Sequence, residues 1–524
     1  MVKVLISDKM SPLAADVFKA RGVEVDVKTG LDKEELAKII GEYDGIAIRS
    51  SSKLTPKTLA KPGNLKVIGR AGIGVDNVDL PCATQAGIVV MNTPFGNAIT
   101  TAEHAITMML SLARQIPAAN ASTHAGKWEK SSFMGVELMA KTLGIIGCGN
   151  IGAIVADRAQ GLKMKVVAFD PFLSEERAAE LGVEKLDLDG LLARADFISL
   201  HTPLTDQTRN VLDATALNKT KPGVRIINCA RGGLIDEIAL KAAIESGHVA
   251  GAALDVYAQE PATENPLFGM SQVVCTPHLG ASTSEAQEKV AVQVAEQMAD
   301  YLLNGAVTNA LNMASVSAEE APKLKPYMML AEQLGGFAGQ ATQTAIKAID
   351  ICYEGHVSTL NTKPLTAIVL KGLLGPLLVG VNMVNAPVIA EERNIKILES
   401  RSETVGDYHT LITVTVTTED QTRSVKGTLF NQEPRLVKIK GIHIDSKLGP
   451  NMLYLTNRDK PGLIGALGSL LGDAGVNIAT FNLGRADEGG DAIALIEVDG
   501  QPPADVMAQV QSLEHVVHAI SMKF

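Results

Sequence analysis

The chain has 524 residues, 46% of them hydrophobic and 20% charged, so it is long enough for several buried cores and too long for one ordinary domain. Lys and Arg number 48 against 58 Asp and Glu, a net charge of −10, which argues against a broad nucleic-acid or anionic-membrane surface. Five scattered cysteines without a CxxC pair argue against a disulfide framework or a zinc site. We therefore expect a cytoplasmic protein with no metal, nucleic-acid or membrane partner.

The first part of the chain alternates short apolar strands with amphipathic helices. VKVLIS, SPLAADVFKARG and VEVDVK read as strand, helix and strand, and DGIAIRS and LKVIGRAG read as further strands. A long helix predicted over residues 96–114 would lead the chain out of this domain, and another over 285–304 would lead it back. The sequence thus predicts a discontinuous α/β domain, residues 1–97 and 286–314, around a second α/β domain, residues 98–285.

The next part of the chain begins with a change in composition. SVSAEEAPKLKP, residues 315–326, mixes charges with two prolines and is typical of a linker. From Tyr327 the pattern predicts a helix and then strands, an α+β intervening domain over 315–449 whose ligand stays open. The most apolar stretch, Gly372 to Val381, contains Pro376 and is too short to span a membrane, so we expect it in a core.

The last 75 residues form a separate pattern. Residues 450–524 read as strand, helix, two strands, helix and strand, an order typical of a ferredoxin-like layer. The expected fold class is therefore α/β, with two Rossmann-like doubly wound domains followed by an α+β domain and a ferredoxin-like domain.

The strongest motif is TLGIIGCGNIGAIVADRAQGLKMKVVAFD. A strand runs into Gly147, Gly149 and Gly152 in a GxGxxG turn, a helix follows, and a second strand ends at Asp170. The turn would bring backbone N–H groups and the helix N-terminus to a pyrophosphate. Asp170 lies 170 − 152 = 18 residues beyond the third glycine, where an acid binds a ribose hydroxyl and repels a 2′-phosphate. The motif predicts NAD binding.

Three later segments place charged residues at expected strand ends. They carry Arg231, Asp255 with Glu260, and His278. Loops at the carboxyl ends of parallel strands line one crevice, so these segments can converge. A guanidinium can grip a carboxylate, an imidazole can exchange a hydroxyl proton, and a carboxylate can orient that imidazole. The combination suits the chemistry of a 2-hydroxy acid.

These motifs also carry a family resemblance. CARGG, DVYAQEP and PHLGAST, with GRAGIGVDNVD and GCGNIG, closely resemble the D-isomer-specific 2-hydroxyacid dehydrogenases. The resemblance implies Arg231 as the substrate-carboxylate clamp, His278 as the acid/base and Glu260 as its partner. Beyond the three glycines, the implied NAD contacts are Asn150, Ile151, Asp170, Thr202, Cys229, Ala230, Arg231, Asp255, His278, Leu279, Gly280 and Ala281.

The resemblance extends to the long form of this family, which has an intervening domain and an ACT domain at residues 450–524. It implies NAD-dependent oxidation of 3-phospho-D-glycerate to 3-phosphohydroxypyruvate, the first step of L-serine synthesis, by a homotetramer. The implied phosphate ligands are Arg49, Arg70 and Lys130, and the implied L-serine site is Asn457, Asp459 and Asn477. Two alternatives stay open: a different D-2-hydroxy acid, such as glycerate or 2-hydroxyglutarate, or an NAD-sensing protein without enzymatic activity.

Overall fold

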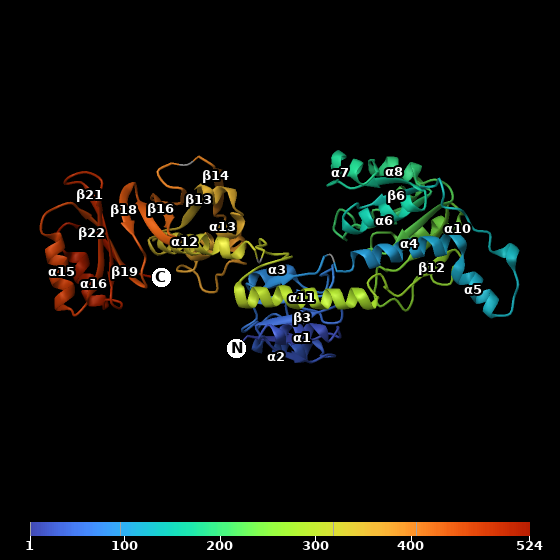
Figure 1. Cartoon of the computed structure of the whole chain (residues 1–524), viewed down its shortest axis with the longest axis horizontal. Coiled ribbons are helices and arrows are strands. Elements are labelled where there is room, and N and C mark those ends of the chain that lie inside the picture. Colours follow the sequence, from blue (N-terminus) through green and yellow to red (C-terminus); the bar gives the residue numbers. More distant parts are fainter. Residues whose placement is uncertain (1, 95, 318, 405) are drawn as a thin grey trace. The chain divides into compact units, whose positions relative to one another are not determined.

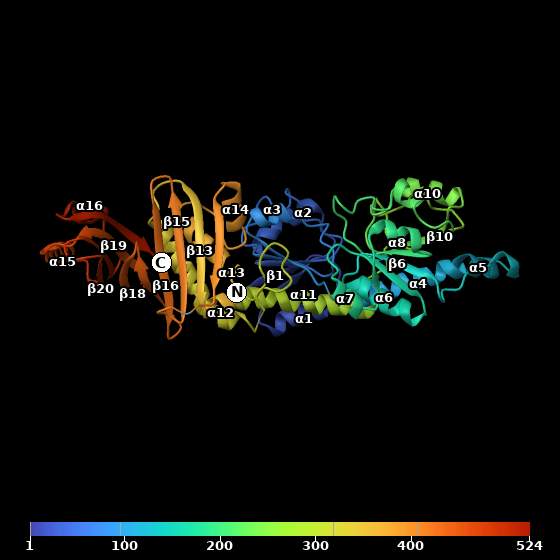
Figure 2. The same cartoon turned by 90° about the horizontal axis from the view of Figure 1, so that it is seen from above.

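The computed structural model of the chain describes residues 2–94, 96–317, 319–404 and 406–524. The contacts between residues separate two compact units: unit 1 comprises Met1–Asn92 and Val294–Phe524, and unit 2 comprises Thr93–Gln293. Figures 1 and 2 label many of the helices and strands of both units.

Unit 1 begins with a parallel sheet of five strands in the order β2-β1-β3-β4-β5. These strands are β1 (Lys3–Ile6), β2 (Glu24–Val27), β3 (Gly45–Ile48), β4 (Val67–Arg70) and β5 (Val89–Met91). The helices are α1 (Leu13–Ala20), α2 (Lys33–Ile39), α3 (Leu80–Gln85) and the part of α11 (Ser284–Asn304) from Val294 onward. A Cβ at Gly69 would lie 2.2 Å from Met298 Sδ, so the glycine lets α11 pack directly on β4. The predicted returning helix is therefore present.

Unit 2 contains a parallel sheet of seven strands in the order β12-β11-β10-β9-β6-β7-β8. The strands are β6 (Thr142–Ile146), β7 (Lys165–Phe169), β8 (Glu184–Lys185), β9 (Phe197–Leu200), β10 (Val224–Asn228), β11 (Val249–Leu254) and β12 (Val273–Cys275). The helices are α4 (Ala98–Arg114), α5 (Ile116–His124), α6 (Asn150–Gly161), α7 (Glu175–Glu180), α8 (Leu188–Arg194), α9 (Ala214–Asn218) and α10 (Glu237–Glu245).

Helices cover both faces of this second sheet. The apolar sides of α4 and α6 share one core with Ile145 and Ile227, whereas α8, α9 and α10 share another with Ile146 and Ile226. Successive strand residues thus enter opposite cores, as a strand with two buried faces requires. The strand order reverses direction between β6 and β9, which is the ligand-binding position in a doubly wound sheet.

The intervening segment of unit 1 has a mixed sheet in the order β14-β13-β15-β16-β17-β18. Its strands are β13 (Ile346–Gly355), β14 (Lys396–Ser402), β15 (Thr410–Thr418), β16 (Thr422–Phe430), β17 (Glu433–Ile439) and β18 (Ile442–Ser446), and its helices are α12 (Ala321–Gln340), α13 (Lys363–Leu374) and α14 (Ala386–Glu392). A Cβ at Gly335 or Gly339 would lie 2.2 Å from a carbonyl oxygen of α13. These glycines let the two helices touch backbone to backbone.

Two expectations for this segment need correction. The proposed linker over 315–326 is too long, because α12 already begins at Ala321; residue 318 of that linker lies outside the described residues. Pro322 falls in the first helical turn, where a missing N–H costs no hydrogen bond. The apolar stretch Gly372 to Val381 is only partly core: its α13 end is buried, but Leu377 is 43% exposed and Val379 is fully exposed.

The chain leaves the helix at that point for a local reason. Helix α13 ends at Leu374, and Gly375 and Pro376 follow it, so the apolar residues beyond them lie outside regular structure. Among the described residues, no helix has the combined length and apolar character that crossing a membrane requires.

The last segment has the predicted order of elements: β19 (Asn451–Arg458), α15 (Leu463–Asp473), β20 (Ile478–Arg485), β21 (Asp491–Val498), α16 (Ala504–Ser512) and β22 (Val516–Lys523). The antiparallel sheet has the order β20-β21-β19-β22. Leu453 and Leu455 pack with α15 and α16, whereas Met452 and Tyr454 join the core of the intervening segment. The two last segments therefore share one hydrophobic core.

Candidate active site

The GxGxxG turn joins β6 to α6 in unit 2. Gly147 has φ 90°, and a Cβ there would lie 2.8 Å from the His201 carbonyl carbon, so both the turn and its neighbour require glycine. A Cβ at Gly152 would lie 2.2 Å from the Gly147 carbonyl oxygen. At Gly149, in contrast, an added Cβ would meet no atom of the described residues within 4 Å. The space beside Gly149 is thus open to a ligand, and the residues fit a bound pyrophosphate.

Asp170 lies directly beside this turn, at the end of β7. Its carboxylate accepts hydrogen bonds from the backbone N–H of Cys148 at 2.8 Å and of Phe172 at 2.8 Å. Thr202 follows β9, the neighbouring strand on the other side of β6. The structure therefore gathers the predicted dinucleotide residues at one edge of the sheet, around the point where the strand order reverses.

Arg231 lies in the loop after β10. The buried Asn228 amide holds this loop, since it donates to the Arg231 carbonyl oxygen at 2.9 Å and accepts from Ala230 N–H at 3.1 Å. A Cβ at Gly232 would lie 1.7 Å from the Tyr257 carbonyl oxygen, so glycine lets this loop pack against the one that follows β11. Cys229, at the start of the loop, is buried, and burial raises the pKa of its thiol.

His278 and Glu260 form the predicted pair. His278 Nδ1 lies 2.7 Å from Glu260 Oε2, and Glu260 Oε1 accepts the Tyr257 backbone N–H at 3.0 Å. Burial acts to raise the pKa of Glu260, but the hydrogen bonds from His278 and Tyr257 outweigh it and lower the pKa overall. Glu260 is therefore ionised at neutral pH and orients the imidazole, which is half exposed.

Asp255 is the buried centre of this group of loops. It is 0% exposed, and its carboxylate accepts the backbone N–H groups of Leu279 at 2.7 Å and Gly280 at 2.8 Å. Thr276 donates its hydroxyl at 2.6 Å. Since these three partners lie on both sides of His278, which has φ 56°, Asp255 fixes the turn that carries the imidazole.

His104 is a member of this group that the sequence reading missed. It projects from α4, with Nε2 3.2 Å from Asp255 Oδ1 and 3.4 Å from Thr276 Oγ1. Burial acts to raise the pKa of Asp255, but the hydrogen bonds from His104, Thr276 and Leu279 lower it overall. A lone polar ring in the mostly apolar and small-residue helix GNAITTAEHAITMMLSLAR was the signal that could have indicated it.

His104, Cys229 and Asp255 also offer three potential metal-ligand atoms within 4.8 Å of one another. The carboxylate already accepts hydrogen bonds from both backbone groups, Thr276 and His104. Burial disfavours the thiolate of Cys229, which is the form that binds metals. The arrangement is therefore better suited to hold a loop than to hold an ion.

The predicted phosphate ligands fall in different places. Arg49 follows β3 and Arg70 ends β4, so both lie at the carboxyl ends of adjacent parallel strands of unit 1, where Ile48 pairs with Arg70. The Arg49 backbone N–H donates to Asp8 Oδ2 at 2.6 Å. A Cβ at Gly72 would lie 1.5 Å from Arg70 Nη1, so that glycine, φ 144°, makes room for the guanidinium. Lys130 is exposed in the short helical turn Lys130–Ser132 of unit 2.

Two of the predicted serine ligands, Asn457 and Asp459, lie at the end of β19 and just after it, and Asn477 lies between α15 and β20. Asp459 accepts hydrogen bonds from Arg485 at 2.9 Å and Gly489 N–H at 3.1 Å, and Asn477 donates to Asp499 at 2.8 Å. Asp459 is thus bonded to the end of β20 and the turn that follows it, and Asn477 to the residue after β21. Asn457 is buried, its Nδ2 donates to the Arg458 carbonyl oxygen at 3.0 Å, and its Oδ1 has no hydrogen-bond partner within the described part of the chain.

Three sequence families match successive parts of the chain. Residues 106–280 match the D-isomer specific 2-hydroxyacid dehydrogenase, NAD binding domain; residues 323–440 match the D-3-phosphoglycerate dehydrogenase intervening domain; and residues 452–515 match the ACT domain. The D-3-phosphoglycerate dehydrogenase of Synechocystis is 44% identical over 100% of this chain and 95% of its own length. That of Bacillus subtilis is 41% identical, with 99% and 98% covered.

Solved structures match about three fifths of this chain. A glyoxylate reductase from Paecilomyes thermophila, 30% identical, has a TM-score of 0.56 over 59% of this chain and 98% of its own. The TT0316 protein from Thermus thermophilus, 33% identical, has a TM-score of 0.55 over 59% and 100%. The chain belongs to the D-isomer specific 2-hydroxyacid dehydrogenase family, in its branch with the D-3-phosphoglycerate dehydrogenase intervening domain and an ACT domain.

Proposed function

We propose that this chain is an NAD-dependent dehydrogenase that oxidises 3-phospho-D-glycerate to 3-phosphohydroxypyruvate, the first step of L-serine synthesis. The observation that carries the proposal is the hydrogen-bonded His278 and Glu260 pair on loops of a dinucleotide-binding sheet. The substrate follows from relatives of that name that match over nearly the whole chain.

In this proposal the turn from Gly147 to Gly152 and the start of α6 bind the pyrophosphate of NAD, and Asp170 binds a ribose hydroxyl. Bound NAD supplies the acceptor for a hydride. Asp170 is a carboxylate, which would repel a 2′-phosphate, so the chain would bind NAD in preference to NADP. The remaining chemistry belongs to side chains of the loops after β10, β11 and β12.

His278 acts as the acid/base. Because Nδ1 faces Glu260 at 2.7 Å, Nε2 is the nitrogen that takes the substrate hydroxyl proton during oxidation and returns it during reduction. Ionised Glu260 stabilises the protonated ring between these steps. Arg231 binds the substrate carboxylate through its fork of N–H groups and orients the reacting carbon.

Further residues would complete the substrate and effector sites. Arg49, Arg70 and Lys130 would bind the phosphate group, and Asn457, Asp459 and Asn477 would bind L-serine at the ACT domain. The unsatisfied Oδ1 of buried Asn457 supports its role as an acceptor for a ligand ammonium group. The assembly would be a homotetramer in the cytoplasm, in keeping with five cysteines that form no disulfide.

The test is the initial rate of NADH oxidation by the purified protein with 3-phosphohydroxypyruvate, hydroxypyruvate and 2-oxoglutarate. We expect the highest kcat/KM with the phosphorylated acid. His278→Ala should lower kcat by a factor on the order of 10² to 10⁴ and still bind NADH. His124→Ala, an exposed histidine of α5, is the matched control and should retain full activity.

The same assay separates the alternatives. Preference for an unphosphorylated acid, with no loss of kcat/KM in Arg49→Ala, would move the assignment to another D-2-hydroxy acid. Tight NADH binding with no turnover of any acid would indicate an NAD sensor. Arg49→Ala is expected to raise KM for the phosphorylated acid by about tenfold or more, with little change for hydroxypyruvate.

A further inference from the structure

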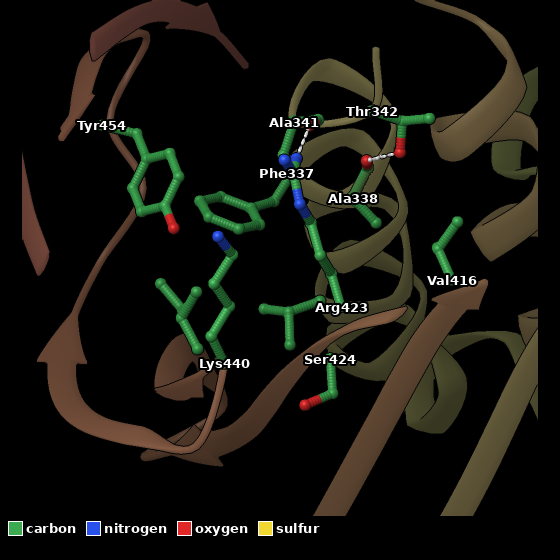
Figure 3. A pocket seen from close by; sticks show the side chains of 11 residues that line it. Phe337, Ala338, Ala341, Thr342, Val416, Arg423, Ser424, Lys440 and Tyr454 are labelled. Atoms are coloured by element: carbon green, nitrogen blue, oxygen red, sulfur yellow. Dashed lines mark hydrogen bonds between the residues drawn. The ribbon is translucent and has the colours of Figure 1, made fainter. Parts of the chain in front are cut away.

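A small cavity lies where the intervening segment meets the sheet of the last segment. Its volume is about 20 Å³, and its walls come from the C-terminal end of α12, from β16, from the turn after β17 and from β19. Phe337, Arg423, Lys440 and Tyr454 line it (Figure 3). All of these elements belong to unit 1 and pack on one continuous hydrophobic core.

Two positively charged side chains reach this cavity from different strands. Arg423 donates through Nε to Gln421 Oε1 at 2.8 Å and through Nη1 to the Ala341 carbonyl oxygen, and both acceptors are neutral. Lys440, an exposed residue, extends from the turn after β17. Within residues 2–94, 96–317, 319–404 and 406–524, neither side chain has a carboxylate at ion-pair distance; Asp491, which acts on Lys440 from farther away, is paired with Arg458.

A third group in the wall has no partner. Tyr454 is 2% exposed, and its hydroxyl makes no hydrogen bond with any described residue. In Figure 3 this hydroxyl and the Lys440 ammonium point into the same space beside the Phe337 ring. A buried hydroxyl without a partner is destabilising, so such groups in native proteins are normally bound by water or a ligand.

The charges in the cavity wall indicate the sign of the charge that a ligand of this cavity would carry. Burial and the nearby Arg423 lower the pKa of Lys440, and burial together with the same two cations lowers the pKa of His518. Arg423 and Lys440 repel each other, although the exposure of Lys440 weakens that repulsion, and a bound anion would offset it. Arg, Lys and a phenolic hydroxyl are all hydrogen-bond donors that suit an anion.

We propose that this cavity is a binding site for a small inorganic anion, which Arg423 and Lys440 bind by charge and Tyr454 binds through its hydroxyl. A volume of about 20 Å³ admits a species little larger than a water molecule, such as chloride or one oxygen-bearing face of a phosphate. Because α12 lies on one side and β19 on the other, the anion links the intervening segment to the ACT domain. This site is separate from the proposed NAD and L-serine sites.

The test uses the full-length protein at constant ionic strength, with a large organic sulfonate as the background anion. Sodium chloride or sodium phosphate is titrated against the sulfonate, and thermal unfolding is followed by the fluorescence of Trp128 and of an added dye. Wild type should show a saturable rise in Tm, on the order of 2–4 °C. Tyr454→Phe and Lys440→Gln should each need at least tenfold more anion for the same rise.

Two further comparisons separate an anion site from a structural role. Without chloride or phosphate, Lys440→Gln should be at least as stable as wild type, since it removes one of two facing cations. Lys438→Gln, the same change on β17 but outside the cavity wall, should keep the full response to the anion. A larger response to phosphate than to chloride identifies an oxyanion as the natural ligand, and the reverse identifies a halide.

The proposal would be overturned if the wild type showed no saturable rise in Tm. It would equally be overturned if Tyr454→Phe and Lys440→Gln responded as the wild type and Lys438→Gln do, because the anion would then act elsewhere. Neither outcome bears on the proposed dehydrogenase activity, which does not involve these three side chains.

Discussion

Asp255 in unit 2 and Tyr454 in unit 1 are almost equally buried, yet their polar atoms differ in hydrogen bonding. Asp255 accepts hydrogen bonds from two backbone N–H groups, a threonine and a histidine. The Tyr454 hydroxyl has no hydrogen bond from the described residues, and the two cations that line the same cavity have no carboxylate of the described residues at ion-pair distance. The difference shows that burial alone does not identify a binding site. A buried polar group with all its hydrogen bonds made holds a loop in place, whereas a buried group without them leaves a donor for a ligand.

The largest loss of stability should come from replacing Asp255, the fully hydrogen-bonded residue of this comparison. Asp255→Asn places an NH₂ group among donors and removes a buried charge that four donors stabilise, so the free energy of unfolding should fall by about 3 kcal/mol. Urea unfolding of the NADH-free protein measures this change. Asp445→Asn, an exposed acid on β18, is the control and should stay within about 0.5 kcal/mol of wild type. Equal stability of the two variants would contradict the role given to Asp255.

The second effect is a pH dependence of stability that comes from His201, a residue of unit 2 with one ring nitrogen that lacks a hydrogen bond. His201 bonds Ser199 through Nε2 at 2.8 Å, its buried Nδ1 has no partner in the described part of the chain, and burial lowers its pKa from 6.5 to about 4. Below pH 6.5 the unfolded chain gains a proton that the folded chain does not, so stability is lost as the pH falls toward 4. We expect a loss of about 1 kcal/mol per pH unit, allowing for partial exposure.

The measurement compares wild type with His201→Gln in urea at several pH values between 6.5 and 4.5. Other groups titrate in both proteins, so the difference between the two slopes isolates His201. Parallel slopes would show that this ring takes up its proton in the folded protein as readily as in the unfolded one, and would contradict the lowered pKa of His201.

The smallest loss of stability should come from replacing His104, the side-chain partner of Asp255 on α4. His104→Leu removes one donor at 3.2 Å but leaves the two backbone N–H groups and Thr276, so the loss of stability should be about 1 kcal/mol. The turn from His278 to Ala281 should loosen, and NADH should bind a few-fold more weakly. A fluorescence titration with NADH measures the second effect, with exposed His124→Leu as the control; unchanged affinity and stability would exclude a positioning role for His104.

Part of the fold could be predicted because its signals are local. The glycines and the terminal acid of the GxGxxG segment specify one turn, one helix packing and one carboxylate within 24 residues of sequence, Gly147 to Asp170. The β-α-β-β-α-β order of the last segment follows from short apolar runs separated by turn residues. Glu260 and His278 could be named because the resemblance carries them, and the structure places them in hydrogen-bond contact.

The rest depends on contacts that local patterns do not encode. The start of α12 was missed because prolines suggest a linker, although Pro322 stands where a helix tolerates it. His104 is 151 residues from Asp255 and reaches it only because α4 packs over β10, β11 and β12. Arg423, Lys440 and Tyr454 come from three separate elements, each unremarkable alone, and the lack of a counter-charge is visible only in three dimensions.

The two-faced sheet of the ACT domain has a consequence for how this part of the protein can be cut or recombined. Met452, Tyr454 and Met522 lie in the core of the preceding segment, and the Tyr454 ring meets Phe337 of α12 edge to face at 5.1 Å. A fragment that begins at residue 450 would expose this apolar face to solvent. The remaining part of the chain would expose the apolar face that packs against it. Gene fusions that borrow this domain should therefore take residues 321–524 as one block.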